Sequence, residues 1–448
     1  MNHNTKSPQN NIFERKSLAI SADLTTLLCE IGIVLVMVGM HLGTIIRNII
    51  PALELVNIFM LLSAVLIVCG FKFSAFNSFP HKTALFLLVI YHITMAVLAK
   101  IYDYNSAPFN VSCVAYHLFV PIFAVCLVSS RSAPINTTRL LRILFYTTGF
   151  MAIALFSMAL DASGSIMNIS GRLTLPHGGD PIALPRSMIV YFIAALLYKA
   201  QNVLESCLKV VFSFCAFISI MAFNTRAVYV GLLLVLVIGL IKKTQVEKAT
   251  SRQQIAAFVT VFSIVILFVI LYLTNDFLRI RFDEIIQTTQ RGILTYFGDT
   301  SMGSDMSTSY RHEIRQTIYS DISNNFSIPS LLFGFAEYMK YYVDIPILQA
   351  FYDGGLFFGA IYFYFTFYIV AKHLFLYKGE VSQLQLLFLL FSFQYLLDQF
   401  YCGLPYNYYM WTPGVFIWVF FSKKEKELPI VAPPSKYVKN PSRSLLHK

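Results

Sequence analysis

The sequence predicts an all-α, polytopic membrane protein, and three observations indicate this fold class. Hydrophobic residues make up 57% of the 448 residues, charged residues only 13%, and mean hydropathy is +0.64. Apolar runs recur along the chain, many of them near the roughly 20 residues that an α-helix needs to cross a bilayer. The seven cysteines are scattered, almost all within apolar runs and without a C-x-x-C pair. We therefore expect buried thiols rather than metal ligands or a disulfide framework.

Counted against that length, the apolar runs predict about twelve transmembrane helices. The first is expected to be an uncleaved anchor, because polar residues lead into a long apolar run without a small-residue cleavage site. The chain then divides into membrane helices over 1–274, a large hydrophilic loop over 275–345, membrane helices over 346–421 and a tail over 422–448. The expected spans are 24–46, 52–71, 83–101, 109–129, 140–160, 187–201, 207–223, 226–241, 255–274, 346–371, 383–400 and 410–421.

Lysine and arginine give the expected orientation. Of the 34 basic residues, 23 fall on the side that holds both chain ends, which predicts that both termini are cytoplasmic and the 275–345 loop is outside. These short basic clusters explain the net charge of +11 better than a nucleic-acid partner does.

The two expected sides of the membrane also differ in which basic residue they carry. The expected outer side carries nine Arg and only two Lys. Guanidinium groups pair with phosphate through two hydrogen bonds, so this bias suits a ligand that bears a diphosphate. The alternative is that these arginines form salt bridges within the fold.

Two outer corners contain candidate binding residues. The Gly- and Pro-rich stretch from Gly171 to Arg186 predicts a shaped loop that brings Arg172 and Arg186 to the membrane surface. A polar re-entrant cap is the alternative for this loop. Arg226 lies at an outer corner where two spans are joined by a very short turn. There it can hold a lipid diphosphate at headgroup depth. Alternatively, its side chain extends to the headgroups of bulk lipid.

Within the large loop, Tyr310-Arg311-His312 opens a stretch that predicts an amphipathic helix capped by the preceding Ser307-Thr308-Ser309. Arg311 and Arg315 are one turn apart and can grip one diphosphate. Alternatively, both arginines pair with the nearby carboxylates of Glu313 and Asp321. A second face, formed by Ile314, Ile318 and Ile322, is expected to rest on protein or lipid.

The loop ends where the chain re-enters the membrane. Partial burial of Asp344 at this point would make it a usable general base, although it can instead cap the helix ahead of Pro346. The stretch Asp353–Gly359 has a small-x-x-x-small pattern, which predicts a helix packing contact rather than chemistry. The aromatic corner Tyr401–Trp411 suits either sugar stacking or a membrane-interface belt.

Together these segments resemble the O-antigen polymerase and ligase superfamily of bacterial envelope glycosyltransferases. The resemblance lies in the second half of the chain, in Asn224–Ala227, Tyr310-Arg311, Leu332-Phe333-Gly334 and Asp344 with Gly355. It implies a GT-C-like fold in the bacterial inner membrane that acts at the periplasmic face on undecaprenyl-diphosphate-linked glycans, without a metal or other cofactor.

The resemblance also implies roles for individual residues. Arg226 and Arg311 would hold the donor diphosphate, and Asp344 would act as the base, with His312 and Glu313 as substitutes. The ligases usually have a histidine where this chain has Asp344, which favours a polymerase. Further candidates for substrate binding, taken from the corners and the loop helix described above, are Arg172, Arg186, Tyr310, His312 and Arg315.

The implied partners are a glycan donor, a glycan acceptor, membrane lipids and a chain-length regulator. Two alternatives stay open: a ligase that transfers glycan to lipid A core, and a flippase or other transporter of lipid-linked oligosaccharide. Transporters favour repeats and ionisable residues in broken helices at mid-membrane depth. We recognise few such residues in this sequence: Glu30, His92 and His117.

Overall fold

The computed structural model describes residues 8–53, 55–101, 107–163, 183–223, 226–246, 306–335, 345–377, 381–399 and 403–421, with Leu175 and short pieces between 266 and 301. Within these residues every regular element is a helix. The elements are α1 (Pro8–Ile49), α2 (Val56–Val68), α3 (Phe73–Asn77), α4 (Lys82–Ile101), α5 (Ala107–Ser130), α6 (Thr137–Ser163), α7 (Ala183–Leu197), α8 (Val203–Phe223), α9 (Arg226–Val246), α12 (Met306–Asn324), α13 (Ile328–Phe333), α14 (Pro346–Phe363), η2 (Tyr364–Tyr368), α15 (Ile369–Ala371), η3 (Lys372–Leu376), α16 (Gln383–Asp398) and α17 (Tyr408–Phe421).

The chain is a helical membrane protein by the length and composition of its helices. Among the described residues, 6 helical stretches are long and apolar enough to cross a bilayer: Asp23–Ile49, Lys82–Ile101, Cys113–Ser130, Thr137–Leu160, Val203–Ile220 and Pro346–Leu376. Shorter apolar helices occur over Val56–Val68, Met188–Leu197 and Gln383–Phe393. These helices lie where spans were expected, whereas most of the expected 255–274 span falls outside the described residues. The full set of about twelve spans stays a prediction.

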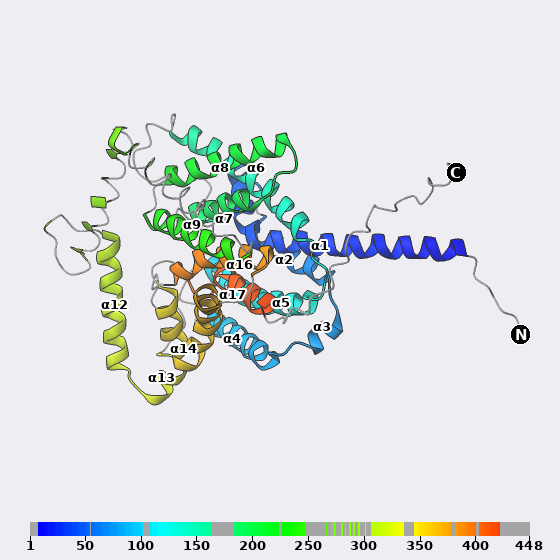
Figure 1. Ribbon diagram of the computed structural model, residues 1–448. Coiled ribbons are helices and arrows are strands. Elements are labelled where there is room, and N and C mark those ends of the chain that lie inside the picture. The colour runs from blue at the N-terminus through cyan, green and yellow to red at the C-terminus, as the bar shows by residue number, and fades with distance from the viewer. Residues whose placement is uncertain are drawn as a thin grey trace, which may run out of the picture.

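The helices form a bundle with two distinct sides (Figure 1). The Pro8 end of α1 projects from one side, and α12 runs across the opposite side, which we call the α12 side. Which side of the bundle faces the cytoplasm stays a prediction.

The core of the bundle is built around α17. All residues from Tyr408 to Val419 are buried, which is the environment expected for a helix that is apolar on every face. Gly414 lets α17 approach η2 closely, because a Cβ there would collide with the carbonyl oxygen of Phe365. Phe416 stacks on Phe388 of α16 with ring centroids 4.6 Å apart. Close backbone approach and ring stacking together place α17 in the centre of the bundle.

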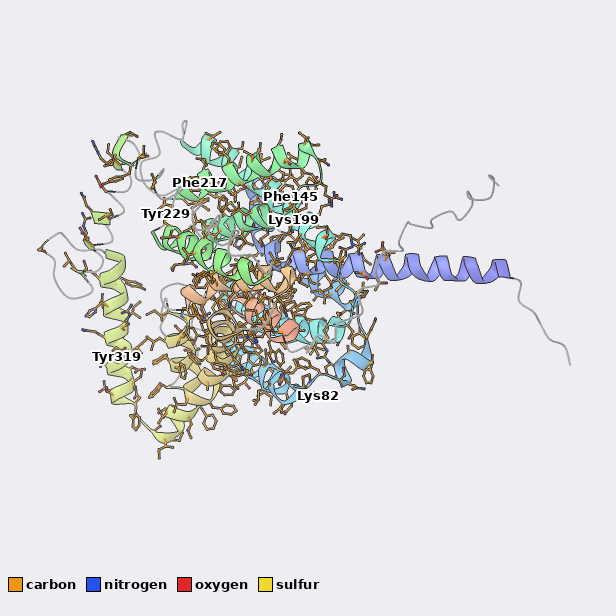
Figure 2. The ribbon with its side chains drawn as sticks, viewed as in Figure 1. Lys82, Phe145, Lys199, Phe217, Tyr229 and Tyr319 are labelled. Carbon is orange, nitrogen blue, oxygen red and sulfur yellow. The ribbon has the colours of Figure 1, made fainter. Side chains whose placement is uncertain are left out.

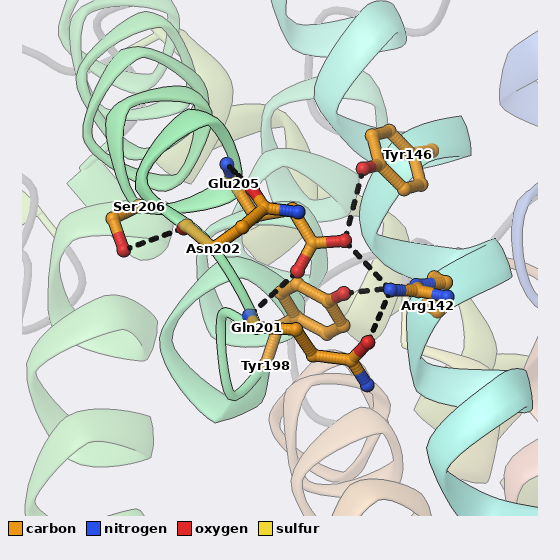
Figure 3. A network of polar contacts seen from close by, with 7 residues as sticks. All are labelled: Arg142, Tyr146, Tyr198, Gln201, Asn202, Glu205 and Ser206. Carbon is orange, nitrogen blue, oxygen red and sulfur yellow. Dashed lines mark hydrogen bonds and ion pairs between the residues drawn. The ribbon is translucent and has the colours of Figure 1, made fainter.

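A polar network joins α6 to the connection between α7 and α8 and to the start of α8 (Figure 3). Glu205 accepts hydrogen bonds from the backbone N–H of Gln201 at 2.7 Å and from Arg142 Nη2 at 2.9 Å. Arg142 also donates to the Tyr198 hydroxyl at 3.1 Å. A carboxylate in the first turn of α8 also faces the positive end of the helix dipole. Both charges are thus paired, which indicates a structural clamp.

A second clamp joins α1 to α6. Glu30 is fully buried and accepts from Arg139 Nε at 2.6 Å and from the backbone N–H of Asn136 at 2.7 Å. Arg139 reaches the exposed Asp23 at 2.6 Å as well. Glu30 is therefore a paired structural residue rather than an isolated charge inside a span.

Candidate functional site

The α12 side of the bundle is organised around a break in α14. Gly355 has φ 63° and ψ −165°, a conformation that L-residues with a side chain rarely adopt, and the helix is interrupted there. The backbone of Leu332–Gly334 rests against this break, since a Cβ at Gly355 would lie 2.5 Å from the Phe333 nitrogen and 2.6 Å from the Gly334 nitrogen. The small-residue helix contact expected at Asp353–Gly359 is thus made, at Gly355, with the C-terminal end of α13. The glycine makes room for the backbone of the last residues of α13 and of Gly334, which follows them.

The apolar face of α12 packs on this junction. Ile318 is fully buried with Phe335 and Tyr352, and the partly buried Ile314 and Ile322 join them. The isoleucine stripe expected to rest on protein or lipid therefore rests on protein. The helix starts at Met306, so the three residues expected to cap it lie inside it.

A polar contact fixes α12 further. The hydroxyl of Tyr352 in α14 donates to Asp321 Oδ2, and Asn325 Nδ2 donates to Asp321 Oδ1 at 2.7 Å. Asp321, which was considered as a partner of the loop arginines, thus has two hydrogen-bond donors from elsewhere. The backbone N–H of Phe335 donates to the Tyr352 carbonyl at 3.0 Å. The described part of the large loop that ends at Phe335 is therefore held to α14.

The outward face of α12 is polar. Tyr310, His312 and Glu313 are exposed, and His312 Nε2 lies 2.9 Å from Gln316 Nε2. Arg315 is partly buried one turn beyond the position of Arg311. The helix thus presents several groups that can hydrogen-bond to a polar ligand beside the junction.

Polar residues are also buried below the junction, along the first half of α14. Gln349 Nε2 donates to Asp353 Oδ2 at 2.7 Å, and both side chains are buried. The backbone N–H of Ile347 reaches the carbonyl of Gln399 at 3.4 Å, which ties the start of α14 to the end of α16. Gln399 Oε1 in turn accepts from the Tyr362 hydroxyl at 2.5 Å. Buried polar side chains therefore continue from α14 into α16.

Next to Gln399, a buried ion pair joins α16 to α7. Arg186 Nη1 lies 2.7 Å from Asp398 Oδ2, and the two side chains are 3% and 0% exposed. Arg186 is in the first turn of α7 and Asp398 is the last residue of α16, so each charge opposes the dipole of its own helix. The pair therefore stabilises charges that their helix positions alone would disfavour.

A histidine pair lies deeper in the bundle. His92 Nδ1 of α4 and His117 Nδ1 of α5 are 3.0 Å apart, and both rings are buried. The Trp411 ring contacts His92 at 4.2 Å, Tyr91 at 4.8 Å and Tyr362 at 5.1 Å between centroids. One nitrogen of the pair must donate and the other accept, which fixes complementary tautomers. These rings connect the histidines to the Gln399 region.

The predicted site residues fall into three groups. Arg186 is described and lies inside α7 rather than in a surface loop, paired with Asp398. Tyr310, His312 and Arg315 are all residues of α12. Arg226 opens α9 and Arg311 lies within α12, but their side chains, and all of Arg172 and Asp344, are outside the described residues.

Sequence reasoning missed four buried polar residues of this region: Gln349, Asp353, Asp398 and Gln399. Each lies inside an apolar run. A polar or charged residue in a membrane-spanning segment is itself a candidate for function, so a search for such residues would have found all four. Within the described part of the chain, no three His, Cys, Asp or Glu side chains are grouped so that they could hold a metal ion.

No protein-family model matches this chain, and no curated protein matches it at a significant level.

Proposed function

We propose that this protein is a glycosyltransferase that polymerises undecaprenyl-diphosphate-linked repeat units into O-antigen or a related surface polysaccharide. One observation carries the proposal: the start of α9 and the loop helix α12 belong to the same side of the bundle. In Figure 2, Tyr229, one turn from Arg226, lies at the end of the bundle nearest α12, whereas Lys82 lies toward the other end. Two separate arginine-bearing elements on one side provide what a lipid-linked diphosphate requires.

The proposed reaction is a nucleophilic displacement at the anomeric carbon of the donor. The acceptor's sugar hydroxyl oxygen forms the new glycosidic bond, and its proton passes to Asp344. The bond between the anomeric carbon and the diphosphate oxygen breaks, and undecaprenyl diphosphate leaves with the electron pair. Arg226 and Arg311 stabilise that developing negative charge, with Arg315 and Arg172 as additional cations. His312, exposed beside Gln316, is the substitute base.

The surface polysaccharide of a deletion strain tests this function. Loss of a polymerase leaves single repeat units on the lipid A core, whereas loss of a ligase leaves bare core. Complementation with R226A or R311A should not restore long chains, although both variants insert into the membrane. Long chains from both variants, or bare core in the deletion strain, would rule out the proposal.

The break in α14 favours a second candidate, transport of a lipid-linked oligosaccharide. Transporters often place their sites at discontinuous helices. Here Asp353 lies two residues before the break, and the His92–His117 pair lies buried between α4 and α5. A transporter would move labelled lipid-linked substrate across liposomes without lengthening it. Chain growth in the same liposomes would instead support the polymerase.

A further inference from the structure

We infer that α13 and its flanks enter the acyl-chain region of the bilayer and anchor the large loop in the membrane. The sequence assigned all of 275–345 to the aqueous side. Within it, residues 326–335 (Phe-Ser-Ile-Pro-Ser-Leu-Leu-Phe-Gly-Phe) contain no charged side chain. This segment, which we call the α13 segment, has the composition of a membrane-interface element rather than of a solvated loop.

The α13 segment exposes an unusually apolar surface. No residue of the helix itself is buried, and Phe326, Ile328, Leu332 and Phe333 are 61%, 71%, 40% and 58% exposed. Isolated exposed apolar residues are ordinary, but four within eight residues on one short helix and its flank form a patch that water solvates poorly.

This patch continues onto the lipid-facing surface of a spanning helix. Phe333 contacts Phe357 of α14 with ring centroids 6.2 Å apart, and Leu356 and Phe357 are themselves exposed within the candidate span Pro346–Leu376. Residues of a spanning helix that face outward from the bundle meet acyl chains. The same acyl chains can therefore cover the α13 segment without a gap between the two surfaces.

The backbone of the α13 segment is also suited to an apolar medium, where every unpaired N–H or C=O is destabilising. Ser327 and Ser330 form a reciprocal capping box, with Ser327 N–H to Ser330 Oγ at 2.9 Å and Ser330 N–H to Ser327 Oγ at 3.2 Å. Pro329 has no N–H to satisfy. At the other end, Gly334 N–H donates to the Ser330 carbonyl at 2.8 Å.

The segment is also held rigidly at the depth of the helix break. Gly334 packs directly on the Asp353 carbonyl, and Phe335 N–H donates to the Tyr352 carbonyl at 3.0 Å. The patch therefore cannot move away from the membrane without separating α13 from α14. This geometry favours lipid over a second copy of the chain as the occupant, because the surface that continues from it already faces lipid.

Tryptophan fluorescence in vesicles tests the inference. The two native tryptophans, Trp411 and Trp418, are buried, so a new exposed tryptophan adds a distinct signal. We would reconstitute F333W and I328W in phosphatidylcholine vesicles with and without brominated acyl chains, with F357W as the lipid-facing control and Y310W on the polar face of α12 as the aqueous control.

We expect brominated lipid to quench the added fluorescence of F333W and I328W about as strongly as that of F357W, and acrylamide to quench Y310W more strongly than either. Two positions guard against one variant that fails to fold. Strong acrylamide quenching with no effect of brominated lipid at both positions would overturn the inference. Shielding from both quenchers that depends on the protein-to-lipid ratio would also overturn it, because it would indicate a second copy of the chain on this surface.

Discussion

The backbone of Gly334 packs against the backbone around Gly355, and there is no room for a side chain at either position. A Cβ at Gly355 would lie 2.6 Å from the Gly334 nitrogen, and a Cβ at Gly334 would collide with the Asp353 carbonyl oxygen. Both residues have positive φ, at 115° and 63°. These close contacts fix the C-terminal end of α13 to α14.

We expect Gly355→Ala to destabilise the protein. The disfavoured backbone conformation alone costs about 1–3 kcal/mol, and the contact with the backbone at the end of α13 adds to it. Thermal unfolding in detergent measures the effect. Gly239→Ala is the matched control, because among the described residues its Cβ would meet Leu390 side-chain atoms at 3.5 Å, an ordinary contact, and it lies in a regular helix, where alanine is favourable. Equal midpoints for the two variants would refute the role given to Gly355.

Arg186→Ala should be much more destabilising than the loss of an exposed ion pair. Removing one partner of a buried pair leaves an uncompensated charge and costs about 3–5 kcal/mol. The double variant R186M/D398L should recover most of that loss, since it leaves no charge behind. As control, Asp23→Ala removes a carboxylate that is 70% exposed, for about 1 kcal/mol or less. If chemical denaturation gave R186A and D23A similar stabilities, the Arg186–Asp398 contact would not be a buried pair.

Tyr352→Phe should loosen α12 without unfolding the bundle. The variant loses the hydrogen bond to Asp321, and bonds to charged groups contribute about 1.5–3 kcal/mol. Cleavage of the 301–327 region by a protease in detergent should then be faster by about tenfold or more, if cutting follows local opening. The control variant Ser320→Ala, at an exposed position on the same helix, should be cleaved at the wild-type rate. An unchanged rate for Y352F would show that the apolar contacts of Ile318 hold α12 unaided.

Much of the fold could be predicted from the sequence, because apolar periodicity and length are local signals. The runs at 83–101, 207–223 and 383–400 coincide with α4, α8 and α16. The isoleucine stripe of α12 was predictable for the same reason, since it depends only on spacing along one helix. Orientation and the complete number of spans stay predictions.

The break in α14 could not be predicted this way. Two adjacent glycines in an apolar run look the same whether the helix continues through them or, as at Gly355, breaks against the end of another helix. The Arg186–Asp398 pair was missed for a related reason. Pro185 is tolerated in the first turn of a helix, so α7 starts early and takes Arg186 into the bundle. Its partner is 212 residues away in sequence, a distance over which no local pattern operates.

Chain growth by the purified protein tests the central claim most directly. The measurement is electrophoresis of glycan after reconstitution in proteoliposomes with an undecaprenyl-diphosphate-linked repeat unit as the only glycan substrate. Our account predicts a ladder of lengthened chains from the wild type and from R279A, an arginine of the large loop outside the proposed site, and none from R226A or R311A. Substrate that crosses the membrane at its original length, or wild-type ladders from both R226A and R311A, would contradict it.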